Sequence, residues 1–160
     1  MGGRSTGEET VCWAWGNSVI VGYLAIVGVM LGLPFPGGNA LEELANSYDG
    51  KCKTRICVKD RQVCLSGLEN LCKKMYNDKY EPGAIAKFCI QSIAASVKAL
   101  YENIVGSGSG MQTVFCGGVA SNATVRGAVE NARTVFAPVE YCTDNAVGTA
   151  VLTAVKEGLV

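Results

Sequence analysis

Two short segments near the C-terminus combine residue types that could hold a phosphorylated ligand. They run from Val114 to Asn122 and from Phe136 to Asn145. Each begins with apolar residues and then changes to small and polar ones. Asn122 can both donate and accept hydrogen bonds, and Asp144 offers the hard oxygen that divalent cations prefer. The pair therefore points to a nucleotide-type site with a metal ion.

The elements around these segments predict how they would be positioned. We expect strands over Val114–Cys116 and Val135–Val139, followed by helices over 122–131 and 143–155. A strand, a crossover helix and a second strand of one sheet should be parallel. Both polar tips would then lie at the carboxyl edge of the sheet, where open α/β sheets bind ligands.

The glycines at the first tip suit that chemistry. Gly117 and Gly118 would let backbone N–H groups approach phosphate oxygens. A simpler interpretation stays open, because a Gly-Gly after a strand is often only a tight turn. Asn122 and Asp144, each just before a helix, could equally be N-caps.

Composition limits the class of protein. The 160 residues suffice for one domain with its own core, and 49% of them are hydrophobic. The formal net charge is zero, from 14 basic and 14 acidic residues. The chain therefore has no basic excess with which to bind nucleic acid by itself.

The sequence contains no histidine. This excludes histidine-based acid–base catalysis, histidine-activated serine or cysteine nucleophiles and histidine metal ligands within these residues.

The cysteines are dispersed and form no CxxC pair, which disfavours zinc ribbons and redox dithiols. We expect buried free thiols in a reducing cytoplasm. A partial metal cluster of Cys52, Cys57 and Cys64 is the alternative.

An uncharged stretch extends from Glu9 to Glu42, and Val19–Leu33 is almost wholly apolar. It could be a transmembrane helix or signal anchor, but glycines interrupt it and few basic residues flank it. We therefore favour a buried or interface-forming helix. Thr10–Trp15 could be a short strand that leads into it.

The middle of the chain predicts mainly helices. We expect helices over Ala40–Tyr48 and 66–74, with Ser66 and Glu69 as a capping box. The pattern of Lys51–Arg61 predicts an exposed hairpin or loop. The longest helix starts at Pro82 and carries an apolar stripe at helical spacing. That stripe consists of Ile85, Cys89, Ile93, Val97, Leu100 and Ile104. The composition of Gly106–Gly110 is typical of a linker.

Four motifs in this order resemble one family, the glycoproteases, also called O-sialoglycoprotein endopeptidases. They are Gly28–Gly38, Leu65–Leu68, Cys116–Asn122 and Cys142–Asn145. The best-understood members of that family are tRNA threonylcarbamoyladenosine transferases of the actin-like ATPase superfamily. The resemblance implies an α/β fold, namely a helix-rich partial RNase-H-like lobe with a small parallel sheet.

The resemblance also assigns roles to residues. It implies that Gly38 and Asn122 bind an adenine nucleotide such as ATP or ADP, with Gly117 and Gly118 beside the phosphates. It implies that Asp144 ligates a divalent metal ion. The family's other metal ligands are two histidines in a preceding lobe, which this sequence lacks, so the metal site is incomplete. An acidic residue that the family places before Gly38 is Ala25 here.

These departures lead to the following expectations. Residues 1–25 form an atypical N-terminal segment, and 26–160 resemble the C-terminal lobe. The protein binds adenine nucleotide weakly and is catalytically impaired alone. Alternatives are half of a two-chain tRNA-modifying transferase or a non-enzymatic scaffold. A peptidase or other hydrolase, which the old family name suggests, is disfavoured without histidine.

The same resemblance suggests partners. Only two or three strands are predicted, fewer than a typical sheet, so an apolar face or edge would need covering. We expect a homo-oligomer or a separate N-terminal lobe, tRNA only through a complex, no membrane and a cytoplasmic location.

Overall fold

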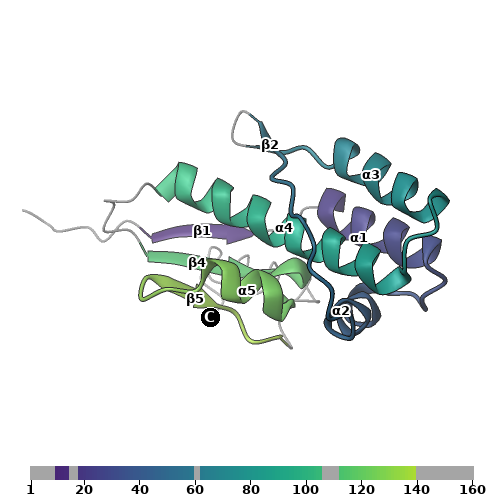
Figure 1. Cartoon of the computed structure of the whole chain (residues 1–160). Helices are drawn as coiled ribbons and strands as arrows, with labels where there is room; N and C mark the ends of the chain where they lie inside the picture. Colours follow the sequence, from purple (N-terminus) through teal and green to yellow (C-terminus); the bar gives the residue numbers. More distant parts are fainter. Residues whose placement is uncertain (1–9, 15–17, 60–61, 106–111, 140–160) are drawn as a thin grey trace, which may run out of the picture.

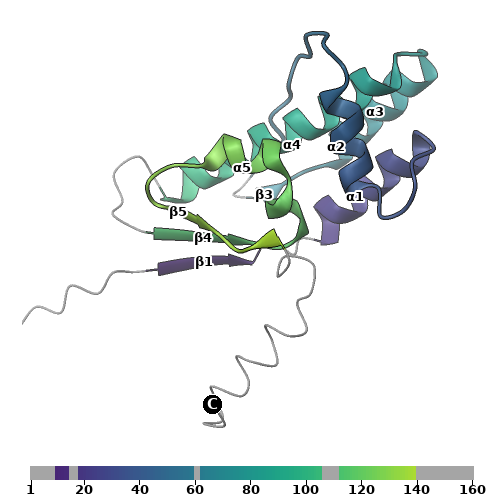
Figure 2. The same cartoon turned by 90° about the horizontal axis from the view of Figure 1, so that it is seen from below.

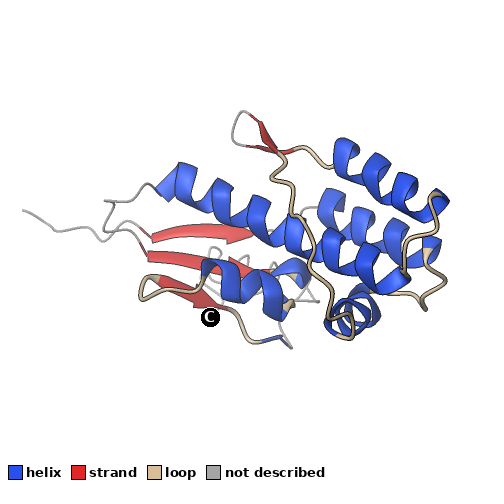
Figure 3. Cartoon of the chain, viewed as in Figure 1, coloured by secondary structure: helices blue, strands red, loops and turns tan. Residues whose placement is uncertain are grey.

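The protein is an α/β domain in which helices predominate (Figures 1 and 3). The computed structural model describes residues 10–14, 18–59, 62–105 and 112–139. Within these residues, one parallel sheet has the strand order β1-β4-β5. Its strands are β1 (Thr10–Ala14), β4 (Gln112–Cys116) and β5 (Thr134–Phe136). The predicted α/β class with a small parallel sheet is confirmed.

One face of the sheet is covered by helices α4 (Pro82–Val105) and α5 (Ala123–Val129), as Figure 2 shows from below. Phe115 in β4 points to that face, where its ring lies 5.7 Å from the ring of Tyr101 in α4 and 5.3 Å from that of Phe136. The predicted strand over 135–139 is too long. β5 ends at Phe136 because Pro138 has no N–H group to donate to a sheet.

The long helix α4 crosses from the sheet into a second group of helices (Figure 1). Its predicted stripe is buried as expected, and Ile85, Cys89 and Ile93 are at most 1% exposed. It packs against α5 and against the three helices of that second group. Ile104, the last residue of the predicted stripe, belongs to α4, but its side chain lies outside the described part.

Helix α1 (Ser18–Met30) is the predicted apolar helix, and it is only half covered. Ile20, Tyr23 and Val27 face the core, whereas Val21, Ile26 and Val29 are 48%, 46% and 66% exposed. In the described part, the only helical span long and apolar enough for a membrane is Pro82–Asn103, and 72% of its most apolar window is buried within the protein. The predicted boundary at residue 25 falls inside α1.

Two further helices and a hairpin complete the second group. Helix α2 (Gly38–Asn46) follows the Pro-Gly-Gly turn. The predicted hairpin or loop over Lys51–Arg61 is a loop over residues 51–57, followed by a hairpin of β2 (Val58–Lys59) and β3 (Gln62–Val63) that extends beyond the predicted end. Helix α3 (Ser66–Asn77) extends beyond its expected end.

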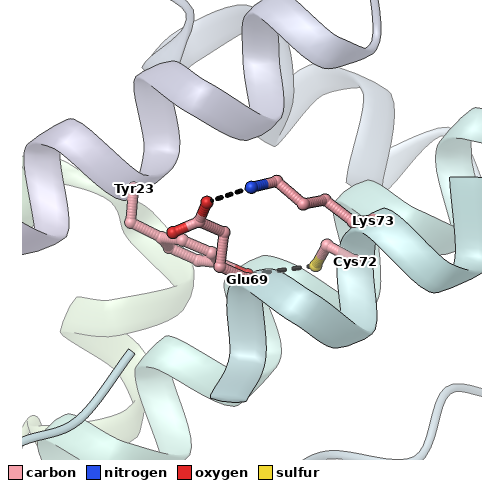
Figure 4. A network of polar contacts seen from close by, with 4 residues as sticks. All are labelled: Tyr23, Glu69, Cys72 and Lys73. Carbon is pink, nitrogen blue, oxygen red and sulfur yellow. Dashed lines mark hydrogen bonds and ion pairs between the residues drawn. The ribbon is translucent and has the colours of Figure 1, made fainter. Parts of the chain in front are cut away.

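The predicted capping box at the start of α3 is wrong. Leu65 occupies the N-cap position and no side chain caps the helix. Glu69 instead pairs with Lys73, one turn further along α3 (Figure 4). The carboxylate of Glu69 thus forms an i,i+4 ion pair with Lys73 instead of accepting a hydrogen bond at the start of the helix. The predicted linker 106–110 and helix 143–155 lie outside the described residues.

A hydrogen bond joins α1 to α3 inside the core. The hydroxyl of Tyr23 and the Sγ of Cys72 are 3.0 Å apart (Figure 4). Burial raises the pKa of Tyr23 far above 10.0, with Cys89 and Cys72 adding to the shift. Burial likewise raises the pKa of Cys89, whereas a hydrogen bond with Cys89 lowers that of Cys72. The neutral forms of Tyr23 and Cys89 are therefore the ones that the fold stabilises.

Glu42 in α2 connects the second helical group to the sheet layer. Its Oε1 accepts hydrogen bonds from the backbone N–H groups of Ala123, at 2.9 Å, and Thr124, at 3.4 Å. These are unsatisfied donors of the first turn of α5, which a carboxylate suits well. One side chain thus fixes α2 against α5.

We predict that Tyr23→Phe is less harmful at high pH than at neutral pH. The pKa of Tyr23 is 10.0 in the unfolded chain and is raised in the folded protein. The resulting contribution to the free energy of unfolding is complete below pH 10.0 and falls as the pH rises above it. The variant should lose about 1 kcal/mol of unfolding free energy at neutral pH, because the hydrogen bond is lost. The difference should shrink in urea titrations above pH 10.0. Tyr80→Phe, at an exposed position, is the control and should behave like the unaltered chain throughout.

We predict that Glu42→Ala lowers the free energy of unfolding by about 1–2 kcal/mol, because two backbone donors lose a charged acceptor at a partly exposed site. Glu43→Ala removes the same group from the neighbouring, exposed position of α2 and should change stability by no more than about 0.5 kcal/mol. Equal effects of both substitutions in urea unfolding would contradict the role given to Glu42.

Candidate functional site

The first predicted tip begins where β4 ends. Gly117 has a φ of 99°, which L side chains rarely adopt, and it precedes the short 3₁₀ turn Gly118–Ser121. Glycine is therefore required at position 117 by the backbone alone. The simpler interpretation as a turn residue accounts for Gly117 without any ligand.

Gly118 differs from Gly117. Its φ lies outside the left-handed range, it is exposed, and a Cβ built on it would meet no atom within 4 Å. The fold therefore leaves room for a side chain at Gly118, as it does at Gly127.

Gly37 and Gly38, at the start of α2, also differ in the space around their Cβ directions. Gly37 is buried, and its Cα lies 3.4 Å from where a Cβ on Gly28 would stand, so these two positions are packed backbone to backbone. Gly38 begins α2 and has no atom within 4 Å of its Cβ direction. A side chain would therefore fit at Gly38, as at Gly118.

Asn122 is the N-cap of α5, as the simpler interpretation proposed. Its Oδ1 accepts a hydrogen bond from the N–H of Val125 at 3.0 Å. Its amide NH₂ group makes no hydrogen bond within the described part of the chain. Capping thus uses the acceptor of Asn122 and leaves its donor for another partner.

Glu42 connects α2 to the start of α5. Gly38 lies one helical turn before Glu42 in α2, about 6 Å along the axis. The Glu42 carboxylate accepts from the N–H of Ala123, the residue that follows Asn122. Three backbone N–H groups at the start of α5, those of Ala123, Thr124 and Val125, are thus already used by Glu42 and by Asn122.

Arg126 holds the two tips in place. Its Nε donates to the carbonyl of Ala120 at 2.6 Å, and its Nη2 donates to the carbonyl of Ala137 at 2.8 Å. Its guanidinium also lies 5.0 Å from the centre of the Phe136 ring. One side chain thereby joins the turn after β4 to the end of β5. Sequence reasoning missed both Arg126 and Glu42, although each is a charged residue close to a predicted motif.

The metal part of the predicted site does not assemble from the described residues. Asp144 lies outside them. In the remainder that the structure describes, no three His, Cys, Asp or Glu residues form a group that could hold a metal ion. The alternative metal cluster of Cys52, Cys57 and Cys64 is therefore wrong, and all three are free thiols. With no histidine in the sequence, the residues present do not fit the metal that the resemblance implies.

Comparison with known proteins agrees with the four motifs. The model of the family described as tRNA N6-adenosine threonylcarbamoyltransferase, TsaD, matches residues 15–151. A protein of that name from Anaeromyxobacter sp. (strain Fw109-5) is 36% identical over 138 residues, which are 76% of this chain and 41% of that protein. One from Treponema pallidum (strain Nichols) is 34% identical over 147 residues, 79% of this chain and 40% of that protein.

The chain thus spans about 40% of the length of these curated relatives. The match of the family model starts before α1 and ends beyond the last described residue, so it contains every motif that carries the resemblance. The chain belongs to the tRNA N6-adenosine threonylcarbamoyltransferase family.

Proposed function

We propose that this protein binds an adenine nucleotide weakly, at a surface formed by Gly38, Gly118 and Asn122, and that it is catalytically impaired by itself. The observation that supports the proposal is that Gly38 and Gly118 lack side chains which the fold would accommodate, and that Glu42 links the helix that begins at Gly38 to the residue after Asn122. Bare backbone on two neighbouring turns suits an approaching phosphate. The donor of Asn122 would add a hydrogen bond to the ligand.

The catalytic part of the proposal rests on what these residues cannot supply. Transfer chemistry assisted by a metal needs several ligands, and the described residues offer no cluster of them. The absence of histidine also removes the commonest acid–base group. We infer that the chain orients a nucleotide and contributes one wall of the site. The finer fold assignment, a partial RNase-H-like lobe of an actin-like ATPase, belongs to the same proposal.

A second candidate function is half of a two-chain tRNA-modifying transferase. It is favoured by the extent of the match, about 40% of each relative, together with the missing histidines. A partner that carries the histidine-bearing lobe would then complete the metal site with Asp144. The zero net charge implies that tRNA binds through such a complex, and the free cysteines suit a cytoplasmic location. Copurification from native cells, with or without that lobe, separates the two candidates.

We predict that calorimetric titration with ADP or ATP and Mg²⁺ gives measurable binding, and that Gly118→Ala or Gly38→Ala weakens it at least about tenfold. A methyl group at either position would stand between the backbone and the phosphate, a loss of about 1.4 kcal/mol or more. Gly127→Ala, at an exposed glycine of α5 with equal free space, is the control and should bind normally.

The thermal stability of all three variants should equal or exceed that of the unaltered chain, since no Cβ would clash. Absence of binding heat at millimolar nucleotide would remove the proposed function. Normal binding by both Gly118→Ala and Gly38→Ala would remove the proposed position of the phosphates.

We also propose that the exposed face of α1 pairs with the same face of a second copy. Val21, Ile26 and Val29 form this face, and α1 contains no charged residue that would repel its counterpart. Large exposed apolar patches usually mark contact surfaces.

We predict that the chain sediments as an oligomer at micromolar concentration and that Val29→Glu shifts it to the monomer. A charge on the apolar face would be buried unpaired in the pair. Val135→Glu, at an exposed valine of the sheet, is the matched control and should leave the oligomer intact. A monomer in the unaltered chain would overturn the proposed pairing of two copies and leave a separate N-terminal lobe as the alternative partner of this face.

A further inference from the structure

The β2–β3 hairpin places two cysteines opposite each other. Val58 pairs with Val63 and Lys59 with Gln62, so the next rung of the ladder consists of Cys57 and Cys64. The N–H of Cys64 donates to the carbonyl of Cys57 at 2.8 Å, whereas the N–H of Cys57 donates to Ser96, so one hydrogen bond closes this rung. Residues opposite each other on antiparallel strands have Cα atoms about 4.5–5.5 Å apart, within the range of about 4.4–6.8 Å that disulfides span.

The two thiols differ in exposure. Cys64 is exposed, whereas Cys57 is buried at the edge of the core, and burial raises the pKa of the Cys57 thiol. A reagent in solution therefore reaches Cys64 first. Both cysteines are free in this structure.

Helix α4 holds the Cys57 side of the hairpin in position. The N–H of Cys57 donates to the Oγ of Ser96 at 2.9 Å, and the N–H of Arg55 donates to the Oγ of Ser92 at 3.1 Å. Ser92 and Ser96 are both fully buried. The backbone of Cys57 is thereby held against α4. The Sγ of Cys57 lies 3.9 Å from the carbonyl oxygen of Arg55, so a bond to Cys64 requires this side chain to turn.

Exposed basic residues lie near this pair in the sequence. Lys51, Lys53 and Arg55 precede the hairpin, and Lys59 belongs to β2. Basic residues attract anionic thiol reagents, of which the tripeptide disulfide oxidised glutathione is one.

We propose that Cys57 and Cys64 form a reversible oxidation site that a glutathione-type disulfide converts to an intrachain disulfide. The Cys64 thiolate attacks one sulfur of the reagent, forms a mixed disulfide and releases one glutathione thiolate. The Cys57 thiolate then attacks the Sγ of Cys64 and releases the second glutathione. Two protein thiols lose two electrons and two protons, and one disulfide of glutathione becomes two thiols.

The other described cysteines are less suited to this reaction. Cys72 and Cys89 are 0% exposed among the helices. The Sγ of Cys52 points to the carbonyl of Ala84 in α4, at 3.6 Å, and belongs to no rung of the hairpin. Cys116, which is half-buried, ends β4 in the parallel sheet and is not part of the hairpin. Among the cysteines that the structure describes, the hairpin thus pairs Cys57 with Cys64.

The test uses the reduced full chain, oxidised glutathione, an acid quench and tryptic mapping without reduction. We expect the peptide Ile56–Lys59 to be joined to the peptide Gln62–Lys73, and fragmentation should place the bond on Cys64 rather than Cys72. A thiol reductant should reverse it. A bond at Cys72, or a chain that keeps glutathione on Cys64 without cross-linking, would overturn the proposal.

Variants separate the two steps. Cys57→Ser should retain glutathione on Cys64 as a stable adduct, because no second thiol can displace it. Cys64→Ser should take up no glutathione at Cys57, which is buried. Cys52→Ser is the matched control and should cross-link at the same rate as the unaltered chain. Loss of the cross-link in Cys52→Ser, or a rapid adduct at Cys57 in Cys64→Ser, would contradict the assignment.

Discussion

The burial of α4 is the constraint on which the described structure depends. This helix has 24 residues and contacts both the sheet layer and the helical group. Apolar side chains on several of its faces are buried. Its first half packs against α1, α2 and α3, and its second half lies over the sheet through Tyr101 and Phe115. The sheet and the helical group hold their relative positions because both cover the same helix.

Upon this frame, two charged side chains position the loops that the family motifs occupy. Glu42 reaches from α2 to the start of α5, and Arg126 reaches from α5 to the turn after β4 and the end of β5. Each satisfies backbone groups that secondary structure leaves open, which gives a charged residue a purely structural task. The glycines beside them differ in the same sense: the backbone accounts for Gly37 and Gly117, whereas at Gly38 and Gly118 a side chain would meet no atom within 4 Å.

The family to which the chain belongs and the functional groups that it contains lead to different expectations about its activity. The match covers all of the motifs, yet the sequence contains no histidine and the described residues include no metal cluster. Orientation of a nucleotide can rest on backbone donors and an amide alone, whereas metal-assisted transfer needs several ligands in one place. The proposal of weak binding with impaired catalysis follows from this difference in requirements.

Much of the fold could be predicted from the sequence because it depends on local patterns. Helical spacing predicted α4 and its buried stripe, apolar runs predicted β4 and β5 as parallel neighbours, and motif order predicted the family. Tertiary structure alone decided which side chain caps which helix. Ser66 did not cap α3, and Glu42 caps α5 across 81 residues. It also placed Cys57 opposite Cys64 instead of in a metal cluster. Sequence spacing records periodicity along the chain, whereas these contacts depend on how separate elements pack in space.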